Sequence, residues 1–468
     1  MAELDLDFTR DALAPLEHYI TIPCISPDYD ANWEQDGHLD SAAHYLTSWA
    51  KTRAIADLTI SIEQLPGRTP LIFCEIGATS DTATGTLAIY GHFDKQPPLG
   101  NWSEGLDPFT PVVRDGKLYG RGAADDGYSL FAAILAVEAL EKAGTKHSRI
   151  VMLIEGSEES GSPDLEPYMD VLSERIGDLE LLICLDSGAQ SYDRLWLTQS
   201  LRGNVTCTLH VGVLEHGMHS GEAGGVVPSS FRIMRHLLDR IEDSSTGEIL
   251  LDALHAQVPA EHQARFVEVA DELGDPVGEA IASLEGLELH GQSGLDRLIT
   301  QAWKPALAFT GISGIPSIEI AGNVLRASTT AKLSFRLPPS VNAQVAAQAI
   351  VEALEADPPH GALVSVKVDR ALGQGWECKA LDPWLATAIE EASLSGFGRS
   401  ASWTSEGGSI PFLAQLGARF SDLAIVATGV LGPGANAHGP DESLDLAMAN
   451  GVTRAVASLI ADFAAKAQ

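Results

Sequence analysis

Basic residues are scarce in this chain, and long apolar runs are missing. Thirty Lys and Arg stand against 64 Asp and Glu, which gives a formal net charge of −34 over 468 residues. Nucleic acids and anionic membrane surfaces attract proteins that carry a positive field, so this balance argues against both as partners. No apolar run approaches the ~18 residues of a membrane span. We therefore expect a protein that binds neither nucleic acid nor membrane.

Cysteine is also rare. The five cysteines are odd in number, widely scattered and without a CxxC pair. Their spacing therefore indicates neither a disulfide framework nor a thiolate zinc site. The segment Met1–Phe8 is acidic and lacks the basic start, apolar centre and small-residue cleavage site of a secretory signal. These features predict a cytoplasmic protein with free thiols.

Apolar strands alternate with helical patterns in the first part of the chain. Strands are predicted at Leu58–Glu63, Leu71–Glu75, Thr86–Tyr90, Ile150–Glu155 and Leu181–Asp186. Helical spacing lies between them, as at Ser129–Ala143. This alternation is typical of an α/β fold whose sheet is covered by helices on both faces. The 45% hydrophobic fraction is ample for such a core.

The pattern changes after Leu201. Strands are then expected at Asn204–Leu214, Ser317–Ile320, Thr329–Phe335 and Ala362–Val368, and helices at Ser229–Ile241 and Val341–Ala356. An acidic helical segment at about Thr246–Leu298 interrupts them, and the α/β style resumes at Leu381. We predict a catalytic domain formed by residues 1–201 and 379–468, with a smaller α+β domain inserted at 202–378.

Acidic and imidazole residues follow the predicted strands. His92 and Asp94 stand two residues apart at a strand end and project to one side. Asp94 can therefore hold the His92 imidazole in the tautomer that leaves one nitrogen for a metal. Asp125 lies in a glycine-rich turn that can point its carboxylate inward, and two carboxylate oxygens can bridge two cations.

Four more residues complete the candidate set. Adjacent glutamates at an extended strand end point to opposite sides, so Glu158 and Glu159 are expected to differ in role, one binding metal and one acting as a base. Asp186 ends a strand and His438 lies in a glycine-rich loop, so both can reach the same crevice. Oxygen and imidazole ligands suit Zn, Mn or Co. Each signal is weak alone, because most histidines and acids are surface groups, and the ordered set carries the prediction.

These motifs resemble one family. Tyr90–Asp94, Gly120–Asp125, Glu155–Ser162 and His438 are similar to Tyr-Gly-His-x-Asp, Gly-Arg-Gly-x-x-Asp, Glu-Gly-x-Glu-Glu-x-Gly-Ser and the late histidine of the dinuclear-zinc metallopeptidases. That family includes carnosinases, aminoacylases, glutamate carboxypeptidases and succinyl-diaminopimelate desuccinylases. The insert adds a second match, because Met218–Gly225 and Leu333–Pro338 resemble the family's His-Ser-Gly loop and arginine strand. The whole looks most similar to carnosinase-like dipeptidases.

The resemblance implies a fold and a metal site. The fold is a three-layer α/β/α zinc-peptidase domain with an inserted ferredoxin-like lid that also forms a homodimer. Two zinc ions per subunit are implied, with Mn or Co as substitutes. His92 and Asp186 would bind one ion, Glu159 and His438 the other, and Asp125 both. Glu158 would be the general base, and the Asp125–Asp126 peptide would be cis.

The resemblance also implies how substrate is held. His219, together with Asn323, would reach the partner subunit's active site and stabilise the oxyanion there. Arg336 would hold a substrate carboxylate through two parallel hydrogen bonds, although a salt bridge is nearly as good an interpretation of a lone arginine in an acidic chain. A free substrate amine would face Glu406, with Gly408 and Ser409 as further contacts.

The chain departs from the family pattern at two places. Gly127 stands where the family often has lysine, and a lid histidine has no clear counterpart in Arg370–Trp376, where Gln374 is the nearest polar residue. The substrate therefore stays open between dipeptides or short peptides and, as the alternative, N-acyl amino acids cleaved by the same site. A non-catalytic binding protein is disfavoured by the complete set of ligands and Glu158. A glycosidase is disfavoured because its two carboxyl groups must face one bond.

Overall fold

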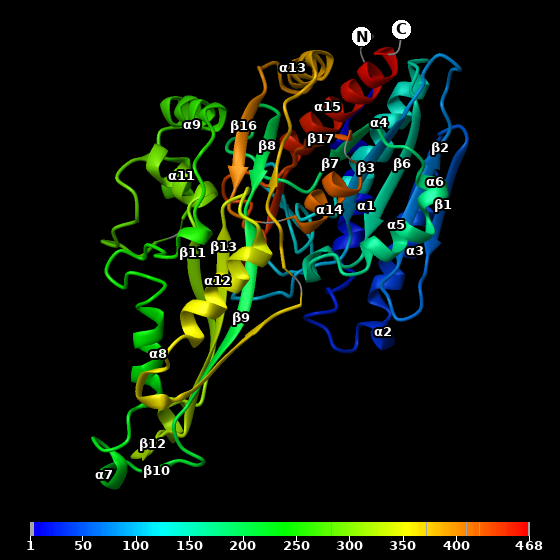
Figure 1. Cartoon of the computed structure of the whole chain (residues 1–468). Helices are drawn as coiled ribbons and strands as arrows, with labels where there is room; N and C mark the ends of the chain where they lie inside the picture. Colours follow the sequence, from blue (N-terminus) through cyan, green and yellow to red (C-terminus); the bar gives the residue numbers. More distant parts are fainter. Residues whose placement is uncertain (1–3, 282, 371, 409, 421, 467–468) are drawn as a thin grey trace.

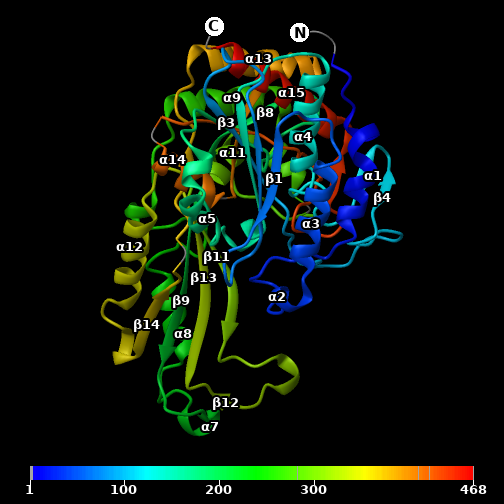
Figure 2. The same cartoon turned by 90° about the vertical axis from the view of Figure 1, so that its right-hand side faces the viewer.

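The computed structural model describes residues 4–281, 283–370, 372–408, 410–420 and 422–466, and Ser409, predicted to contact substrate, lies outside them. Figure 1 shows a layered body that carries both ends of the chain, and an elongated insert that extends away from it. In the view turned by 90°, the insert again projects from one end of the body (Figure 2). The two parts are built from separate sheets.

The body is organised around a six-stranded sheet. In the order of the sheet, its strands are β1 (Leu58–Glu63), β2 (Leu71–Ile76), β6 (Arg149–Glu155), β3 (Thr86–His92), β7 (Leu181–Cys184) and β17 (Ala424–Ala427). The last four are parallel, whereas β1 and β2 are antiparallel at one edge. The residues Ile150–Ile154 of β6 are all apolar and fully buried, as expected for a parallel strand that is covered on both faces.

Helices cover both faces of this sheet. One face packs against α1 (Phe8–Ile20), α3 (His38–Ala50), α4 (Ser129–Lys142), α13 (Pro383–Phe397) and α15 (Leu446–Ala465), and the other against α5 (Leu165–Val171), α6 (Ser173–Ile176) and α14 (Pro411–Arg419). Alternate strand residues join separate cores: Ile89 faces α4 and α15, whereas Tyr90 stacks on Phe412. The predicted three-layer α/β/α fold is thus confirmed.

The insert has its own antiparallel sheet. Its strands, in sheet order, are β11 (Ala306–Ser313), β13 (Ser328–Leu337), β9 (Gly203–Gly212) and β14 (Leu363–Val368), with α8 (Ser230–Leu238) and α12 (Ala343–Glu355) packed on the same core. The chain order β9, α8, β11, β13, α12, β14 and this strand order are those of the predicted ferredoxin-like fold. The change of sheet falls just after Leu201, but the domain division itself stays a prediction.

One predicted strand is wrong. Residues Ser317–Ile320 were expected to be extended, but Ile318–Ile320 form a 3₁₀ turn, and the hairpin partner of β13 is β11 instead. The alternation in this segment does not reflect burial, because Ile318 and Ile320 are 90% and 76% exposed. Alternation predicts a strand only when one face is covered.

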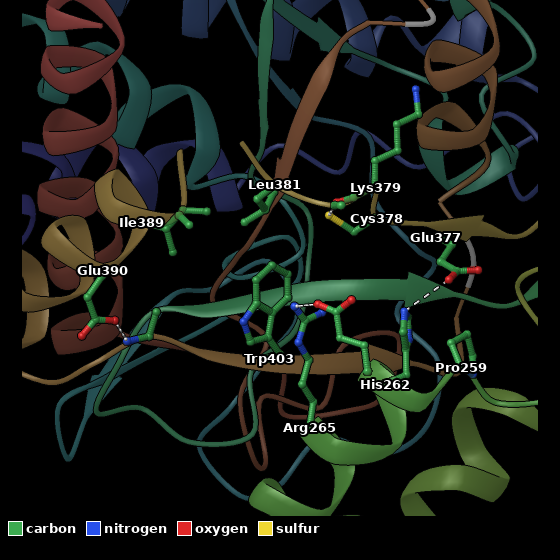
Figure 3. A pocket seen from close by; sticks show the side chains of 14 residues that line it. Pro259, His262, Arg265, Glu377, Cys378, Lys379, Leu381, Ile389, Glu390 and Trp403 are labelled. Carbon is green, nitrogen blue, oxygen red and sulfur yellow. Dashed lines mark hydrogen bonds and ion pairs between the residues drawn. The ribbon is translucent and has the colours of Figure 1, made fainter. Parts of the chain in front are cut away.

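The acidic helical segment links the insert to the body. It contains α9 (Ala260–Leu273), α10 (Pro276–Ala280) and α11 (Gly294–Trp303), which lie beside a three-stranded sheet of β15 (Trp376–Glu377), β8 (Trp196–Leu201) and β16 (Ser402–Glu406). Phe266 and Trp303 join the same core as α13. The Arg265 guanidinium lies 3.9 Å from the centre of the Trp403 ring at this contact (Figure 3).

The remaining α-helices and β-strands of the described residues are short. They are α2 (Trp33–Asp36), β4 (Val112–Arg114), β5 (Lys117–Tyr119), β10 (Met218–His219), α7 (Ser220–Ala223), β12 (Val324–Leu325) and β18 (Ser443–Asp445). Among the helices of the described residues, none has both the length and the apolar character that crossing a membrane requires.

Candidate active site

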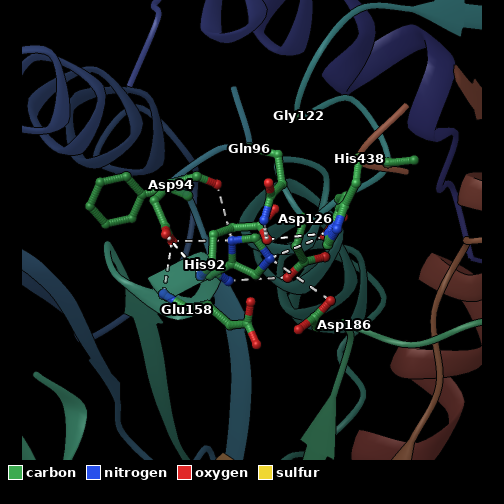
Figure 4. Close-up of polar contacts among 12 residues, drawn as sticks. His92, Asp94, Gln96, Gly122, Asp126, Glu158, Asp186 and His438 are labelled. Carbon is green, nitrogen blue, oxygen red and sulfur yellow. Dashed lines mark hydrogen bonds and ion pairs between the residues drawn. The ribbon is translucent and has the colours of Figure 1, made fainter. Parts of the chain in front are cut away.

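The predicted metal ligands gather where the central strands end. His92 is the last residue of β3, the Glu158–Glu159 pair follows β6, and Asp186 follows β7. Asp125 and His438 enter from two loops, and Figure 4 shows His92 at the centre of the group. Because β3, β6 and β7 are parallel, their carboxyl ends meet at one edge of the sheet, which is where α/β proteins place ligands.

Asp94 fixes the geometry on one side of His92. Its Oδ1 atom lies 3.3 Å from His92 Nδ1, and its backbone oxygen lies 3.1 Å from the same nitrogen. The carboxylate also accepts the backbone N–H groups of Glu158 and Glu159, at 3.1 and 3.0 Å. Nδ1 is thus engaged and His92 Nε2 is directed to the other carboxylates, as predicted.

Asp125 lies between two imidazoles. Its Oδ1 is 3.3 Å from His92 Nε2, and its Oδ2 is 3.0 Å from His438 Nε2. His438 Nε2 is also 3.2 Å from Glu159 Oε2, and Asp186 Oδ1 is 3.8 Å from His92 Nε2. The structure therefore groups His92 with Asp186 and His438 with Glu159, and Asp125 is the carboxylate that both groups share.

The two glutamates diverge, but not for the predicted reason. Glu158–Ser160 form a 3₁₀ turn rather than the end of a strand, so simple alternation does not apply. Glu158 converges with His92 and Asp186, whereas the donor atoms of Glu159 converge with His92 and Asp125. The two side chains thus reach different groups of donors that share His92, from a turn that Asp94 holds through the backbone.

The carboxylates of the cluster lie in a place that disfavours negative charge. Burial raises the pKa of Asp186 and of Glu158 well above their usual range, and burial followed by the nearby Asp125 charge raises that of Glu159. Burial also acts against ionisation of Asp125, yet the two imidazoles hold its pKa low. Partial desolvation of the His438 ring acts to lower its pKa, yet the Asp125 and Glu159 carboxylates raise that pKa to about 11. Ionisation of these four carboxylates therefore depends strongly on nearby positive charge.

The donor set fits divalent metal ions. The imidazole nitrogens and carboxylate oxygens lie 3.0–3.8 Å apart. Two ligand atoms of a tetrahedral zinc ion lie roughly 3.3 Å apart when the metal–ligand bonds are about 2.0–2.1 Å long, so the observed distances are close to that value. The converging donors among the described residues are carboxylate oxygens and imidazole nitrogens. That chemistry suits Zn, Mn or Co.

Two cavities adjoin the cluster, and Arg336 lines both. One, of ≈ 640 Å³, lies between Glu158, Glu159 and His438 of the body and residues of the insert sheet. The other, of ≈ 570 Å³, holds Glu406. Glu406 Oε1 is fixed by three donors, the Ser187 and Thr198 hydroxyls and the Gly188 N–H, each at 2.7 Å. Gly408 also lines the second cavity, and its carbonyl oxygen accepts the backbone N–H of Arg202 at 3.0 Å.

The structure does not bring His219 and Asn323 to the cluster of their own chain. Both are exposed, and β10 pairs with β12 at the far end of the insert, where His219 lies opposite Val324 (Figures 1 and 2). His219 Nδ1 accepts the N–H of Gly221 at 3.0 Å. These two residues therefore serve the site only through another subunit or a large movement.

Both departures from the family pattern have a structural counterpart. A Cβ at Gly127 would lie 2.2 Å from the Gly122 oxygen and 2.2 Å from the Tyr19 ring, so no side chain fits there. A buried lysine lies nearby instead, with Lys95 Nζ 4.1 Å from the centre of that ring. The Gln374 side chain does not take the place of the lid histidine, because it binds the backbone of Ala343 and Val341 within the insert.

The sequence interpretation missed two residues at the cluster. Gln96 donates to Glu159 Oε2 at 2.7 Å and lines the larger cavity. Glu442 is fully buried and binds the loop of Asp125. Their positions, two residues after Asp94 and four after His438, were the available signals. The Asp125–Asp126 peptide is cis, as the resemblance implied.

Comparison with known proteins gives the family. A three-layer α/β body with buried carboxylates and imidazoles at its strand ends is characteristic of metal-dependent hydrolases. The chain belongs to peptidase family M20/M25/M40, whose sequence profile matches residues 88–462. This assignment confirms the resemblance that the motifs indicated.

Named relatives lie within the same family. The chain is 26% identical to a cysteinylglycine-S-conjugate dipeptidase of Corynebacterium striatum over 77% of each chain, and 27% identical to the human Beta-Ala-His dipeptidase over 76% of this chain and 71% of that one. Among solved structures, the di-peptidase Dug1p of Saccharomyces cerevisiae is similar with a TM-score of 0.80 and 23% identity, covering 98% of this chain and 96% of the other. Human carnosine dipeptidase 1 gives 0.77 and 22% over 98% and 97%. At these identities the structures support the fold.

Proposed function

We propose that this protein is a metal-dependent dipeptidase that holds two zinc ions, with Mn or Co as substitutes. The observation that carries the proposal is the position of Asp125 between two donor pairs, with one oxygen directed to each imidazole. His92 and Asp186 would hold one ion, and Glu159 and His438 the other. The named relatives are dipeptidases, which supports the same substrate class over N-acyl amino acids.

The residues around the ions would carry the proton transfers. Bound zinc ions supply Lewis-acid polarisation and make water acidic enough to ionise near neutral pH. Glu158 is the carboxylate beside the His92 and Asp186 pair that is not needed as a ligand in this assignment. It would take the proton of the attacking water and then deliver it to the departing amine. Asp94 would keep His92 oriented throughout.

Charged side chains in the two cavities would bind the two ends of the substrate and so select its length. Arg336 lines both, so a carboxylate held there would place the preceding peptide bond toward the cluster. Glu406 has one oxygen fixed by three donors, which would orient the other toward a substrate amine. Gly408 and, by the family pattern, Ser409 would contact the same substrate.

A second copy of the chain would complete the site. The far end of the insert, which we call the tip, carries exposed Met218, Val226, Ile318, Ile320 and Val324, and the adjacent edge strand β11 exposes Phe309 and Ile312. Apolar side chains gathered on a sheet edge are typical of protein interfaces. A homodimer through the insert would bury them and present His219 and Asn323 to the partner.

Five free thiols support a cytoplasmic location.

Turnover of a substrate panel tests this function. The zinc-loaded protein is assayed with dipeptides and with N-acetyl and N-succinyl amino acids. A dipeptidase cleaves only the substrates with a free amine, whereas preference for the acylated compounds would contradict the proposal. E406A should selectively weaken the binding of substrates that carry a free amine. E390A is the matched control, because Glu390 also supports this sheet, through the Ala401 N–H at 3.1 Å, but does not line the cavity of Glu406.

A further inference from the structure

One carboxylate outside the candidate ligand set holds the loop of Asp125. Glu442 is fully buried. Its Oε1 accepts the backbone N–H groups of Gly122, Ala124 and Asp125, at 3.1, 3.1 and 3.2 Å. Three amides within the four residues Gly122–Asp125 thus converge on a single oxygen. The backbone that presents the Asp125 carboxylate is fixed by this side chain rather than by a helix or a strand.

The same carboxylate is tied to the loop of His438 through Arg121. Oε2 of Glu442 accepts from Arg121 Nη1 at 2.6 Å, and Arg121 Nη2 donates to the backbone oxygen of Gly439 at 2.7 Å. Arg121 is 1% exposed. Because Gly439 follows His438 directly, the pair connects the two loops that carry Asp125 and His438. The backbone N–H of Gly120 adds a further link, to the Glu442 carbonyl at 3.0 Å.

His438 depends on this connection more than the other candidate ligands do. Its side chain is 55% exposed, and its backbone has φ = 64°, a left-handed conformation that a non-glycine residue adopts only when its surroundings hold it. His92, in contrast, ends a buried strand and is held by Asp94. The Arg121–Glu442 pair links the backbone beside His438 to the loop of Asp125, whose Oδ2 lies 3.0 Å from His438 Nε2.

We propose that Glu442 and Arg121 are positioning residues that set the distance between Asp125 and His438 for metal binding. This inference rests on the proposed two-zinc function and deepens it. Groups that orient metal ligands change metal affinity by about 10–100-fold when they are removed. The effect should be larger for the ion of Glu159 and His438 than for the ion of His92 and Asp186.

A second Glu–Arg pair, whose carboxylate is buried, provides the control. Glu138 on α4 is 4% exposed, pairs with Arg53 and accepts the Ala54 N–H at 3.0 Å. It lies nine residues beyond Ser129, the first residue of α4, which is about 13 Å along the helix and away from the cluster. E138Q therefore measures the structural cost of weakening a Glu–Arg pair with a buried carboxylate without a change beside the ligands.

Zinc affinity by chelator competition, with thermal unfolding of the metal-free chain, tests the proposal. Wild type should bind two ions. E442Q and E138Q should both lower the unfolding temperature, but only E442Q should weaken zinc binding, by about 10–100-fold and mainly for one ion. Equal zinc affinity in wild type and E442Q would overturn the positioning role and leave the proposed function standing. Failure of wild type to bind two ions would overturn both.

Should E442Q fail to fold, Arg121 decides the question. R121M keeps the Glu442 bonds to the three amides and removes the link to Gly439. It should weaken the binding of one ion, and R121K, which retains a charge, should restore part of the affinity. Unchanged zinc binding in R121M would overturn the proposal.

Discussion

The strand-end cluster and the tip of the insert are built in opposite ways. In the cluster, charged groups are hidden: His92, Asp125 and Asp186 are 1%, 6% and 8% exposed. At the tip, apolar groups are displayed, with Val226 82% and Ile318 90% exposed. Buried charge and exposed apolar surface are both unfavourable unless a partner relieves them. Bound cations would stabilise the buried carboxylates of the cluster, and contact with a protein surface would cover the apolar side chains of the tip.

This contrast divides the candidate site into two halves with different requirements. The half formed by the strand ends is held by contacts within one chain, such as those that Asp94 makes with His92 and with the Glu158–Glu159 turn. In the proposed dimer, the half that carries His219 would depend on assembly. Metal binding should therefore survive changes at the tip, whereas turnover should not. The following experiments test that separation.

Removal of the metal should have the largest effect. A strong chelator should abolish turnover, and zinc, manganese or cobalt should restore it. Because bound ions stabilise only the folded chain, the unfolding temperature should also fall on chelation. Metal analysis before and after measures the number of ions per chain. Full activity in chelator would contradict the metal-dependent function. Persistence of the proposed dimer in chelator would show that assembly does not require the metal.

The change of Glu158 to Gln should be nearly as severe. Loss of a general base lowers kcat by about 10²–10⁴-fold. The metal content should stay the same, because the remaining donors hold the ions. E166Q is the matched control, since Glu166 lines the same cavity but lies outside the donor cluster. A loss of metal in E158Q would instead make Glu158 a ligand and contradict its role as base.

His219→Ala should lower kcat by about 10²–10³-fold, the usual cost of one oxyanion donor. Metal content should not change, because His219 is remote from the cluster. The decisive measurement mixes H219A with E158Q and allows subunits to exchange. Half of the resulting dimers would be mixed, and each would contain one complete site, so activity should recover to about a quarter of the wild-type value. No recovery, with exchange verified, would exclude action across subunits.

The cluster was more predictable from sequence than the tip. His92, Glu158 and Asp186 follow apolar strands, and the carboxyl ends of parallel strands meet by geometry alone. The wholly apolar Ile150–Ile154 made the central strand easy to recognise. The exposed segment Ser317–Ile320 was wrongly predicted to be a strand. Neither of its faces is covered, so the alternation of its residues does not indicate a strand.

Other features could not be predicted because their partners are backbone groups or distant packing. Glu442 binds amides that lie more than 300 residues earlier in the chain, as in its contact with Gly122 at a separation of 320. Every residue except proline carries a backbone N–H, so the sequence does not show which amides will bind a side chain. Gly127 is required by the Tyr19 ring and the Gly122 oxygen, which only the folded chain brings together. The 3₁₀ turn of Glu158 likewise depends on Asp94.

The smallest predicted effect concerns the acidic helical segment, where α9 packs against β16. His262 on α9 lies 3.3 Å from Glu377 (Figure 3). Its ring is also edge-on to Trp303, and burial lowers its pKa to about 4 from 6.5. The unfolded chain takes up this proton as the pH falls below 6.5, but the folded chain resists until about 4. Stability from this residue is thus present above pH 6.5 and lost toward pH 4, with a slope of at most about 1.4 kcal/mol per pH unit.

His262→Gln removes the titration, so urea unfolding of H262Q should depend less on pH than that of wild type between pH 6.5 and 4. The values at pH 8 give the pH-independent cost of the substitution. Amide exchange should place the acid-induced loosening of wild type in α9 rather than in β3, because the strand-end cluster does not contact this histidine. Parallel pH curves for the two proteins would contradict the assigned role of His262. Loosening of β3 together with α9 would instead show that the insert and the cluster unfold as one unit, and the division between the two halves of the site would not hold.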